Sequence, residues 1–418
     1  MNGEMRPAGR EWYIGIDLGI RWTQVSCYHP GLPEPETKST AAGEGMYRIP
    51  TALCKSRRTG QWCFGEEASR MAESGEGGYV DYLLPRALKQ ETVLLEQEYL
   101  AEDLLQIFLW KAVRMALPEQ GIKAVTKCVF TVKEITDGLV SLLMGILGKL
   151  GLSRSQVAVQ DYRESFYAYA VSQDPELWGY DVMLYSCHGD ELWQKRLSCN
   201  RKTRPMVAAV EEKCLGKLPE KVREWDAAFA GILRKSMAKK IVSSVYLVGS
   251  GFEGDWMEES LQVVCQGKRA FQGKNLYTKG ACYAGMFMQH REEAEVFYFC
   301  EYKMMEHIYI KTARGDGEGI YFLVEAGDNC HQVEKSFRIL TEGDAFLDIW
   351  VQGLDGKGAR AQRLKLPGLA VSRARRNRLE AALWREEGRL LLKLQDIGWG
   401  ALQPGTGLEW EFEIGKGP

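Results

Sequence analysis

Two segments in which an apolar strand runs straight into a glycine turn constrain this chain more than any other feature. The first is YIGIDLGIRWTQVSCY, residues 13–28, and the second is SSVYLVGSGFEGDW, residues 243–256. A strand that ends in a glycine turn presents backbone N–H groups that suit a phosphate. Two such turns, far apart in the sequence, predict a nucleotide held between two lobes.

The length and composition of the chain are typical of a globular protein with two or three domains. It has 418 residues, which is too long for one ordinary hydrophobic core. Apolar residues make up 45% and charged residues 26%, and this balance argues against disorder. Because the net charge is only −2, no global field favours nucleic acid or acidic membranes, and we expect neither as a partner.

The N-terminus and the cysteines favour a cytoplasmic protein. The opening residues MNGEMRPAGREW lack the apolar core of a secretory signal, and the apolar stretch 139–151 is too short to span a bilayer. The eleven cysteines are scattered without CxxC pairs, so we expect reduced thiols. A zinc site near Cys187, His188, Cys199 and Cys214 is an alternative, although the spacing fits no standard pattern.

Up to residue 293 the predicted strands and helices alternate, which indicates an α/β sheet. Residues 13–28 predict a β-hairpin with Asp17, Leu18 and Gly19 at its turn, and residues 48–68 predict two strands joined at Thr59-Gly60. The remaining predicted elements are helices over 99–115 and 137–150, strands over 127–132, 157–159 and 181–185, and a helix ending near 168.

After residue 293 the pattern changes to strand, turn, strand. Seven short apolar segments from Phe297 onward are separated by turns such as 314–317, 354–357 and 387–388. Their spacing predicts a β-sandwich over 297–418. The basic cluster Ser372–Arg378 inside it is interpreted as a solvated loop, because no neighbouring aromatic residues support a nucleic-acid contact.

The glycine loop Gly249–Gly254 is a literal G-x-G-x-x-G between a strand and a helix, so a dinucleotide-binding fold must be considered. That fold needs an acidic residue about twenty positions further on to bind the ribose. Residues 261–290 contain no Asp or Glu, which argues against it. Glycines that serve only tight packing between strand and helix remain a second alternative.

Several blocks, taken in order along nearly the whole chain, resemble the seventy-kilodalton heat-shock chaperones of the actin-like ATPase superfamily. The matching blocks are IGIDLG at 14–19, RIPTALC and FGEEA at 48–68, YLAEDLLQIFLWKAV from 99, QDYRESFYAYA at 160–170, VYLVGSGFEGDWMEESLQ from 245, LYTKGACYAGMFMQ at 276–289, and the late strands LKLPGL and WREEGRLLLKLQDIG. The resemblance implies a two-lobed ATPase fold over 10–293, with lobe I at about 10–180 and a shortened lobe II at about 181–293. It also implies that 297–418 is similar to a chaperone substrate-binding sandwich, here expected to lack the helical lid.

The same resemblance implies the site residues. Nucleotide would be bound by Asp17, Gly19, Ile20, Arg21, Gly249, Ser250 and Gly251. Asp17 would also hold Mg²⁺ through water, and Asp161 is the candidate catalytic acid, although a hairpin-turn Asp17 and a helix-capping Asp161 are the simpler alternatives. Lys89 or Arg86 is a candidate to replace the family's phosphate-contacting lysine, and a solvated helix face is the alternative for both. The expected cofactor is ATP or ADP with Mg²⁺, or none.

Departures from the family pattern argue against ATP hydrolysis. Ile20 and Arg21 stand where the family has small hydroxyl residues, and the second phosphate hairpin, 185–191, has one glycine. Ser186 stands where an acid should organise Mg²⁺, and Asp190 and Glu191 would oppose phosphate. Phosphoryl transfer needs metal, phosphate donors and a positioned base together, so their joint loss predicts a pseudo-ATPase.

Three classes of function follow. The first is a degenerate chaperone-like protein that binds nucleotide weakly or not at all and binds a peptide or protein partner through its sandwich. The second is an active ATP-dependent chaperone with an unusual site. The third is another actin-like protein, such as a filament former or a sugar kinase. The degraded second hairpin favours the first class, and a sugar kinase would not need the sandwich.

Overall fold

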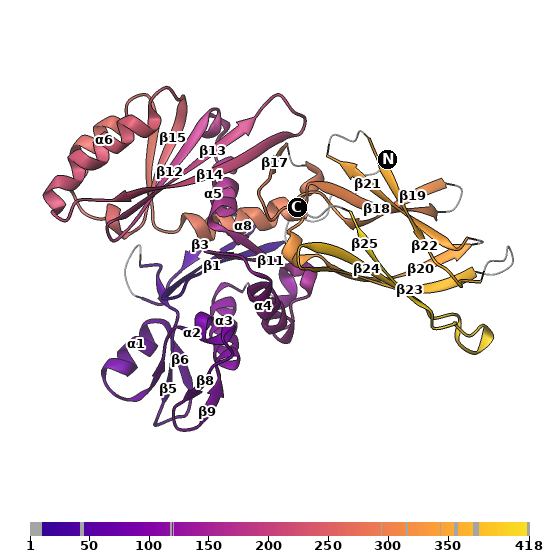
Figure 1. The fold of residues 1–418 in the computed structure, drawn as a ribbon. Coiled ribbons are helices and arrows are strands. Elements are labelled where there is room, and N and C mark those ends of the chain that lie inside the picture. The colour runs from indigo at the N-terminus through magenta and orange to yellow at the C-terminus, as the bar shows by residue number, and fades with distance from the viewer. Residues whose placement is uncertain are drawn as a thin grey trace. The chain divides into compact units, whose positions relative to one another are not determined.

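The computed structural model describes residues 11–41, 46–117, 119, 121–293, 295–314, 317–342, 344–354, 358–370 and 376–415. The chain divides into two compact units, Met1–Tyr298 and Phe299–Pro418. The first unit mixes helices and strands, and the second is rich in strands (Figure 1). Among the described residues, no helix is both long and apolar enough to cross a membrane.

The first half of unit 1 is built on one mixed sheet with the strand order β3-β2-β1-β10-β11. Its elements are β1 (Trp12–Leu18), β2 (Trp22–Tyr28), β3 (Glu36–Lys38), α3 (Ala101–Ala116), β10 (Val125–Val132), α4 (Asp137–Lys149), β11 (Val157–Asp161) and α5 (Tyr162–Val171). A smaller subdomain lies between β3 and α3. It contains β4 (Ile49–Pro50), β5 (Leu53–Ser56), β6 (Trp62–Phe64), α1 (Gly65–Glu73), β7 (Gly77–Val80), α2 (Leu83–Leu88), β8 (Thr92–Leu94) and β9 (Glu98–Leu100).

The second half of unit 1 has a sheet of order β16-β15-β12-β13-β14-β17. Its elements are β12 (Asp181–His188), β13 (Glu191–Asn200), β14 (Met206–Lys217), α6 (Trp225–Met237), β15 (Val242–Val248), α7 (Glu258–Val264), β16 (Arg269–Gly273), α8 (Leu276–Gln289) and β17 (Val296–Tyr298).

The two halves repeat one topology. In the first, β1 pairs antiparallel with β2 and parallel with β10, and β10 pairs parallel with β11. In the second, β12 pairs antiparallel with β13 and parallel with β15, and β15 pairs parallel with β16. The third strand of each half, β3 or β14, extends the antiparallel side. Each half is therefore a three-strand meander followed by two helix–strand crossovers.

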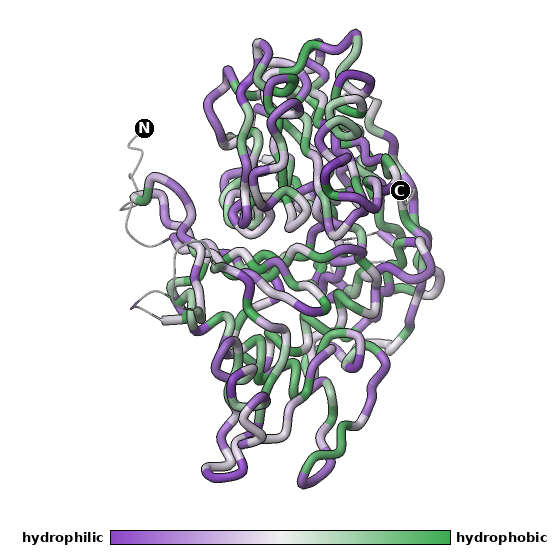
Figure 2. Tube along the Cα trace, turned by 90° about the vertical axis from the view of Figure 1, so that its left-hand side faces the viewer, coloured by the Kyte–Doolittle hydropathy of each residue, from purple (hydrophilic) through white to green (hydrophobic). Residues whose placement is uncertain are grey.

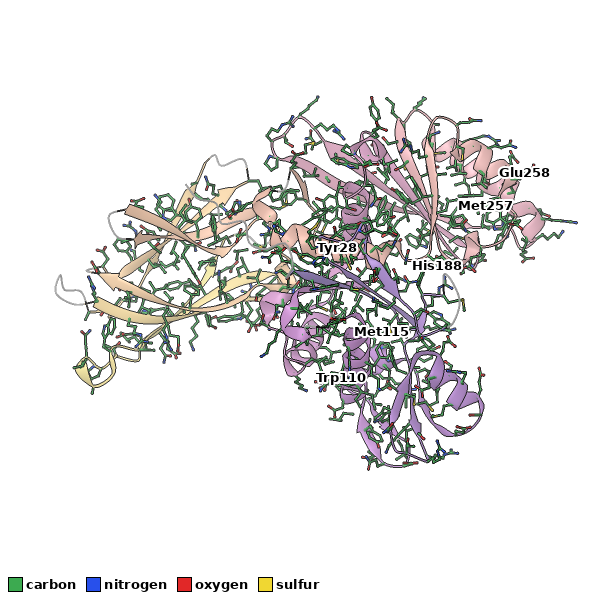
Figure 3. All side chains as sticks on the ribbon, turned by 180° about the vertical axis from the view of Figure 1, so that it is seen from behind. Tyr28, Trp110, Met115, His188, Met257 and Glu258 are labelled. Carbon is green, nitrogen blue, oxygen red and sulfur yellow. The ribbon has the colours of Figure 1, made fainter. Side chains whose placement is uncertain are left out.

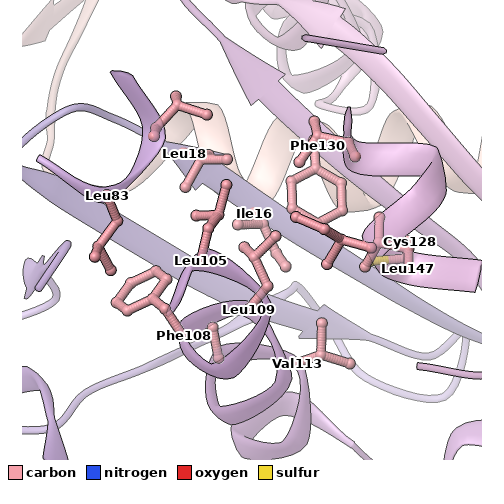
Figure 4. Packing of buried hydrophobic residues seen from close by; sticks show 14 of the residues in the cluster. Ile16, Leu18, Leu83, Leu105, Phe108, Leu109, Val113, Cys128, Phe130 and Leu147 are labelled. Carbon is pink, nitrogen blue, oxygen red and sulfur yellow. The ribbon is translucent and has the colours of Figure 1, made fainter. Parts of the chain in front are cut away.

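Helices α3 and α4 cover one face of the first sheet. Leu105, Phe108 and Leu109 of α3 are fully buried, at the helical spacing that places them on one side of the helix. They pack against Ile16 of β1 and Phe130 of β10 in the core shown in Figure 4. The hydropathy colouring of Figure 2 alternates along the elements of this unit, as expected where each has one buried face.

Helices α5 and α8 lie between the two sheets of unit 1 (Figure 1). Helix α8 approaches β1 so closely that a Cβ on Gly15 would lie 2.1 Å from the Thr278 carbonyl oxygen. Helix α5 packs on the second sheet, where Phe166 meets Tyr246 of β15 edge to face at 6.3 Å. The two helices touch at Gly280, whose added Cβ would lie 2.0 Å from the Ser165 carbonyl oxygen.

Unit 2 consists of two four-stranded antiparallel sheets, ordered β19-β18-β21-β22 and β20-β23-β24-β25. The strands are β18 (Glu306–Arg314), β19 (Gly317–Val324), β20 (Glu334–Glu342), β21 (Phe346–Gly353), β22 (Arg360–Lys365), β23 (Arg376–Glu386), β24 (Arg389–Asp396) and β25 (Glu409–Ile414). The described part of this unit contains no α-helix, so the predicted change to a strand–turn pattern is confirmed.

Some details differ from the sequence-based predictions. The first hairpin turns at Gly19–Arg21, not at Asp17, because Asp17 lies within β1 and pairs with Gln24. Phe297 and Tyr298 belong to unit 1, not to the predicted sandwich, because β17 pairs with β14. Residue 10, residues 315, 316 and 355–357 of two predicted turns, and residues 372–375 of the basic cluster lie outside the described residues.

Candidate functional site

The end of the β12–β13 hairpin lies directly against the second glycine turn. A Cβ on Gly249 would come within 2.3 Å of the Cys187 carbonyl oxygen, and one on Gly251 within 2.3 Å of the Cys187 Sγ. Gly249 also has a φ of +109°, which L side chains rarely adopt. The structure thus brings these two predicted phosphate turns together, and tight packing accounts for both glycines.

The acidic tip of this hairpin, which was predicted to repel phosphate, has part of its charge paired. Strand β12 ends at His188, labelled in Figure 3, and Gly189 and Asp190 form the turn into Glu191. The carboxylate of Asp190 forms a 3.1 Å ion pair with Lys217, which offsets its charge. Ser186, predicted to replace a metal-organising acid, is buried within β12 at 4% exposure.

Asp17 points toward α5 and is held by a tyrosine. The Tyr162 hydroxyl donates a 2.9 Å hydrogen bond to Asp17 Oδ1. Burial raises the pKa of Asp17 to about 7, while the Tyr162 hydrogen bond and the charge of Arg48 lower it by smaller amounts. At neutral pH this carboxyl group is therefore partly protonated, which weakens it as a partner for a hydrated metal ion.

Asp161, the candidate catalytic acid, is the N-cap of α5. Its side chain accepts hydrogen bonds from the backbone N–H groups of Arg163 and Glu164, at 3.0 and 2.9 Å. It also forms a 2.6 Å ion pair with the Arg163 guanidinium and is only 6% exposed. Both carboxylate oxygens are thus engaged, as the capping alternative predicts.

Three cationic side chains act on His188, and we call Arg48, Lys133, His188 and Lys195 the basic junction. Burial lowers the pKa of His188, and the charges of Arg48, Lys195 and Lys133 lower it further, while the charge of Glu191 raises it. Arg48 also acts on Asp17, so one guanidinium lies within electrostatic range of both hairpins. Neither Arg48 nor Lys133 forms an ion pair with any described residue, so their charges are available to an anion.

Lys195 is the buried member of the basic junction. It is 4% exposed, and its Nζ lies 2.6 Å from a carboxylate oxygen of Glu212 on the neighbouring strand. Burial alone would lower the pKa of Lys195, but its contacts with Tyr277 and Glu212 raise it above the ordinary value. This lysine therefore stays charged although it is enclosed.

Two tyrosines connect the hairpins across the unit. The rings of Tyr162 on α5 and Tyr277 on α8 lie with their centroids 4.5 Å apart. Tyr162 donates a hydrogen bond to Asp17 in the first sheet, and Lys195 Nζ in the second lies 5.8 Å from the centre of the Tyr277 ring. A continuous path of contacts thus runs from one sheet to the other.

The predicted nucleotide residues of the first turn have contacts of their own, and Thr51 holds this turn beside β4 through the Arg21 and Gly19 carbonyl oxygens. Gly19 N–H donates to the Trp22 carbonyl oxygen at 3.0 Å and is not offered to a ligand. Ile20 is 51% exposed, and the Arg21 guanidinium lies 5.7 Å from the centre of the Tyr82 ring.

The two candidates for a phosphate-contacting residue on α2 gain little support. Arg86 forms a 3.0 Å ion pair with Glu91, so its charge is already engaged. Lys89 is the C-cap residue of α2 and is exposed, as expected for the solvated alternative.

The amino-acid sequence does not predict the basic junction, because its members come from separate elements. Lys133 carried a usable signal, since it directly follows β10, and ligands of α/β sheets bind at the carboxyl ends of strands. Arg48 and Lys195 carried none, because neither belongs to a recognisable motif. His188 was considered only as part of the hairpin and of a zinc site.

The described residues do not suggest a metal centre. No group of three or more His, Cys, Asp or Glu within them could hold a metal ion, so the zinc alternative gains no support. No disulfide joins any two of the cysteines within the described part of the chain.

Comparison with known proteins gives a family without an assigned activity. The family model described as "Family of unknown function (DUF5716) C-terminal" matches residues 34–301, which is more than half of the chain. A second, described as "Domain of unknown function (DUF8552)", matches residues 303–415. No curated protein matches the chain. The chain therefore belongs to the DUF5716 family of unknown function.

Proposed function

We propose that this protein is a non-hydrolysing, actin-like member of the seventy-kilodalton chaperone branch that binds a phosphate-bearing ligand at the basic junction. Its second unit binds an apolar peptide or a protein partner. The ligand class is a nucleotide such as ATP or ADP, held weakly and with little use of Mg²⁺. The protein acts in the cytoplasm, without nucleic acid or membrane as a partner.

The observation that carries the proposal is that Arg48 acts on both hairpins of unit 1. It acts electrostatically on Asp17 in the first sheet and on His188 in the second. Together with Lys133 it adds positive charge near His188 at the end of β12, whereas the charge of Lys195 is paired with Glu212. Guanidinium and ammonium groups gathered in this way favour a phosphate.

The repeated topology supports an actin-like fold for unit 1. Each half has the same strand order and directions, and α5 and α8 lie between the sheets. Such folds bind ligands at the carboxyl ends of central strands. Two members of the basic junction, Lys133 and His188, stand at the ends of β10 and β12, which fits that position.

The contacts of the two acids argue against hydrolysis. Asp161 is engaged by the α5 backbone and Arg163, so it is poorly placed to accept a proton from water. Asp17 is partly neutral and faces Tyr162. Because metal clamping and a free base are needed together, we expect binding without turnover.

Equilibrium titration with fluorescent ATP, with and without Mg²⁺, tests this site. We expect the double variant Arg48→Glu/Lys133→Glu to raise the Kd by about tenfold or more, since two like charges would face the phosphates. Lys202→Glu/Lys268→Glu, which makes the same charge change at an exposed and a half-exposed position of the second half, should leave the Kd unaltered. Absence of saturable binding, or equal weakening in both double variants, would refute the site.

Phosphate release measured on the same samples tests the lack of turnover. We expect none above a buffer control. Steady release that disappears in Asp161→Asn protein would instead identify an active ATP-dependent chaperone.

The partner-binding part of the proposal depends on aromatic rings of unit 2. Ile308, Ile310 and Ile349 are buried and form core. Trp350 and Phe346 are half-buried, and each has a cation over its ring, Lys311 at 4.2 Å and Arg363 at 3.8 Å. Titration of apolar peptides onto the full chain should give micromolar or weaker binding that Trp350→Ala reduces, while Trp399→Ala serves as the control.

A further inference from the structure

The face of the second sheet beneath α6 holds a cavity of about 460 Å³. This volume falls within the range of small-molecule sites. Side chains alternate between the two faces of a strand, so Gln194 and Arg196 line the cavity while Lys195 between them points the other way, toward Tyr277. The cavity is therefore separated from the basic junction by the sheet itself.

Positive charge dominates the rim of this cavity. Arg196 and Glu211 line it together, but they form a 2.7 Å ion pair and largely cancel each other. Lys213, Lys235 and Lys240 also line it, and none of them forms an ion pair with a described residue. Three uncompensated ammonium groups around one cavity favour an anionic group in the ligand.

The interior of the cavity offers apolar contacts and one open acceptor. Leu215, Ile232 and Ala238 supply apolar surface from β14, α6 and the residue after α6. Gln194 is 7% exposed, and its Nε2 donates to Tyr185 Oη at 3.2 Å and to Met183 Sδ at 3.4 Å. Its Oε1 accepts no hydrogen bond from the described residues, so it is open to a donor on a ligand.

We propose that this cavity binds a small organic anion, a molecule with one phosphate, sulfonate or carboxylate group attached to an apolar ring system. The lysine rim would bind the anionic group, and the ring would lie over Leu215 and Ile232. A hydroxyl or N–H on the ligand would satisfy Gln194. This site does not depend on the function proposed for the basic junction.

Calorimetric titration of the full chain with three matched probes tests both parts of the ligand. The probes are 1-naphthyl phosphate, 1-naphthol and inorganic phosphate. We expect one-to-one binding of 1-naphthyl phosphate, with each of the other two binding at least about tenfold more weakly because each lacks one of the two contacts. Failure of 1-naphthyl phosphate to saturate at millimolar concentration would overturn the proposal.

Two variants test whether 1-naphthyl phosphate binds in this cavity. Lys213→Glu/Lys235→Glu reverses two exposed charges and should weaken the binding of 1-naphthyl phosphate by about tenfold or more. Ala238→Trp, also at an exposed position, should abolish binding by filling the cavity. Lys202→Glu/Lys268→Glu is the matched control and should bind as the parent does. Unchanged binding in the first two variants, or equal loss in the control, would overturn the assignment.

Cysteine labelling gives a second and local readout. Cys214 and Cys265 are exposed thiols, and only Cys214 lines the cavity. Bound 1-naphthyl phosphate should slow alkylation of Cys214 while leaving that of Cys265 unchanged, as followed by peptide mass spectrometry. ATP bound at the basic junction should protect neither thiol. Equal protection of both cysteines by 1-naphthyl phosphate would contradict the site.

Discussion

The Tyr162 hydroxyl donates a 2.9 Å hydrogen bond to Asp17 Oδ1, and this bond joins the first residue of α5 to the first hairpin. The same carboxyl group was expected to face phosphate or a hydrated Mg²⁺. Its actual partner is a phenol inside the protein. Asp17 therefore couples α5 to β1, and its ionisation reports on how the two are packed.

Removing this phenol should make Asp17 harder to ionise. Tyr162→Phe keeps the ring contact with Tyr277 but deletes the donor, so the pKa of Asp17 should rise above about 7. Loss of the buried hydrogen bond should cost about 1 kcal/mol of unfolding free energy. Carbon-detected NMR titration of the Asp17 carboxyl group measures the shift. Tyr180→Phe, at an exposed position, is the control, and a fall in the Asp17 pKa would contradict this assignment.

The raised pKa of Asp17 also predicts a dependence of stability on pH. The folded protein keeps a proton that the unfolded chain releases near pH 4, so this contribution is fully present below the unfolded pKa and is lost as pH rises toward about 7. The loss has an upper limit of about 1.4 kcal/mol per pH unit. The substitution Asp17→Asn should remove this pH-dependent loss of stability.

Urea unfolding of wild-type protein and Asp17→Asn measures this effect. Relative to wild type, the variant should be more stable at about pH 8 than at about pH 5. The opposite trend would mean that Asp17 is stabilised as a carboxylate in the folded state.

Asp161 should contribute to the free energy of unfolding only by capping the N-terminus of α5. Asp161→Ala leaves the first backbone N–H groups of α5 without an acceptor and should cost about 1 kcal/mol. Asp161→Ser retains a capping oxygen but not the carboxylate, and it should recover much of that loss. Urea denaturation separates the two variants. Equal destabilisation by Ser and Ala would show that the ion pair with Arg163, and not the cap, is the important contact.

A side chain at Gly251 should disturb the packing between the second turn and the β12–β13 hairpin. The new Cβ of Gly251→Ala would lie 2.3 Å from Cys187 Sγ, so the hairpin end must move, at a cost of about 1 to 3 kcal/mol. Gly273→Ala meets only Leu276 Cβ at 3.9 Å and is the control. Thermal unfolding compares them. A neutral Gly251→Ala would show that the turn relaxes easily.

Unit 2 should fold without unit 1. Residues 299–418 form their own compact unit with two complete sheets and a buried core that includes Ile308, Ile349, Leu383 and Leu392. We expect the isolated segment to unfold cooperatively in urea and to give dispersed amide NMR signals. Collapsed, poorly dispersed spectra would show that it needs the rest of the chain.

Local patterns predicted much of the secondary structure. The helices predicted over 99–115 and 137–150 differ by only a residue or two at their ends, and α8 spans the block 276–289 that carried part of the resemblance. In unit 2, β20 was missed because its side chains are mostly exposed or half-exposed, which leaves only a weak apolar alternation. Periodicity thus located the elements that bury a clear face.

The site was harder to predict because it depends on contacts between distant segments. The glycines at 249 and 251 suggest a phosphate loop when read locally, whereas Cys187, more than sixty residues earlier, accounts for their lack of a side chain. Likewise, nothing near Arg48 in the sequence indicates that it faces both Asp17 and His188. Only the fold brings such residues together.

The contact between Gly280 and Ser165 has a mechanical consequence. No side chain separates the backbones of α5 and α8 at this point. Rings of the same two helices pack against each other elsewhere along their length, as Tyr162 and Tyr277 do at 4.5 Å. Helix α8 rests on the first sheet and α5 on the second, so a residue larger than glycine at position 280 would push apart the helices and, with them, the two halves of unit 1.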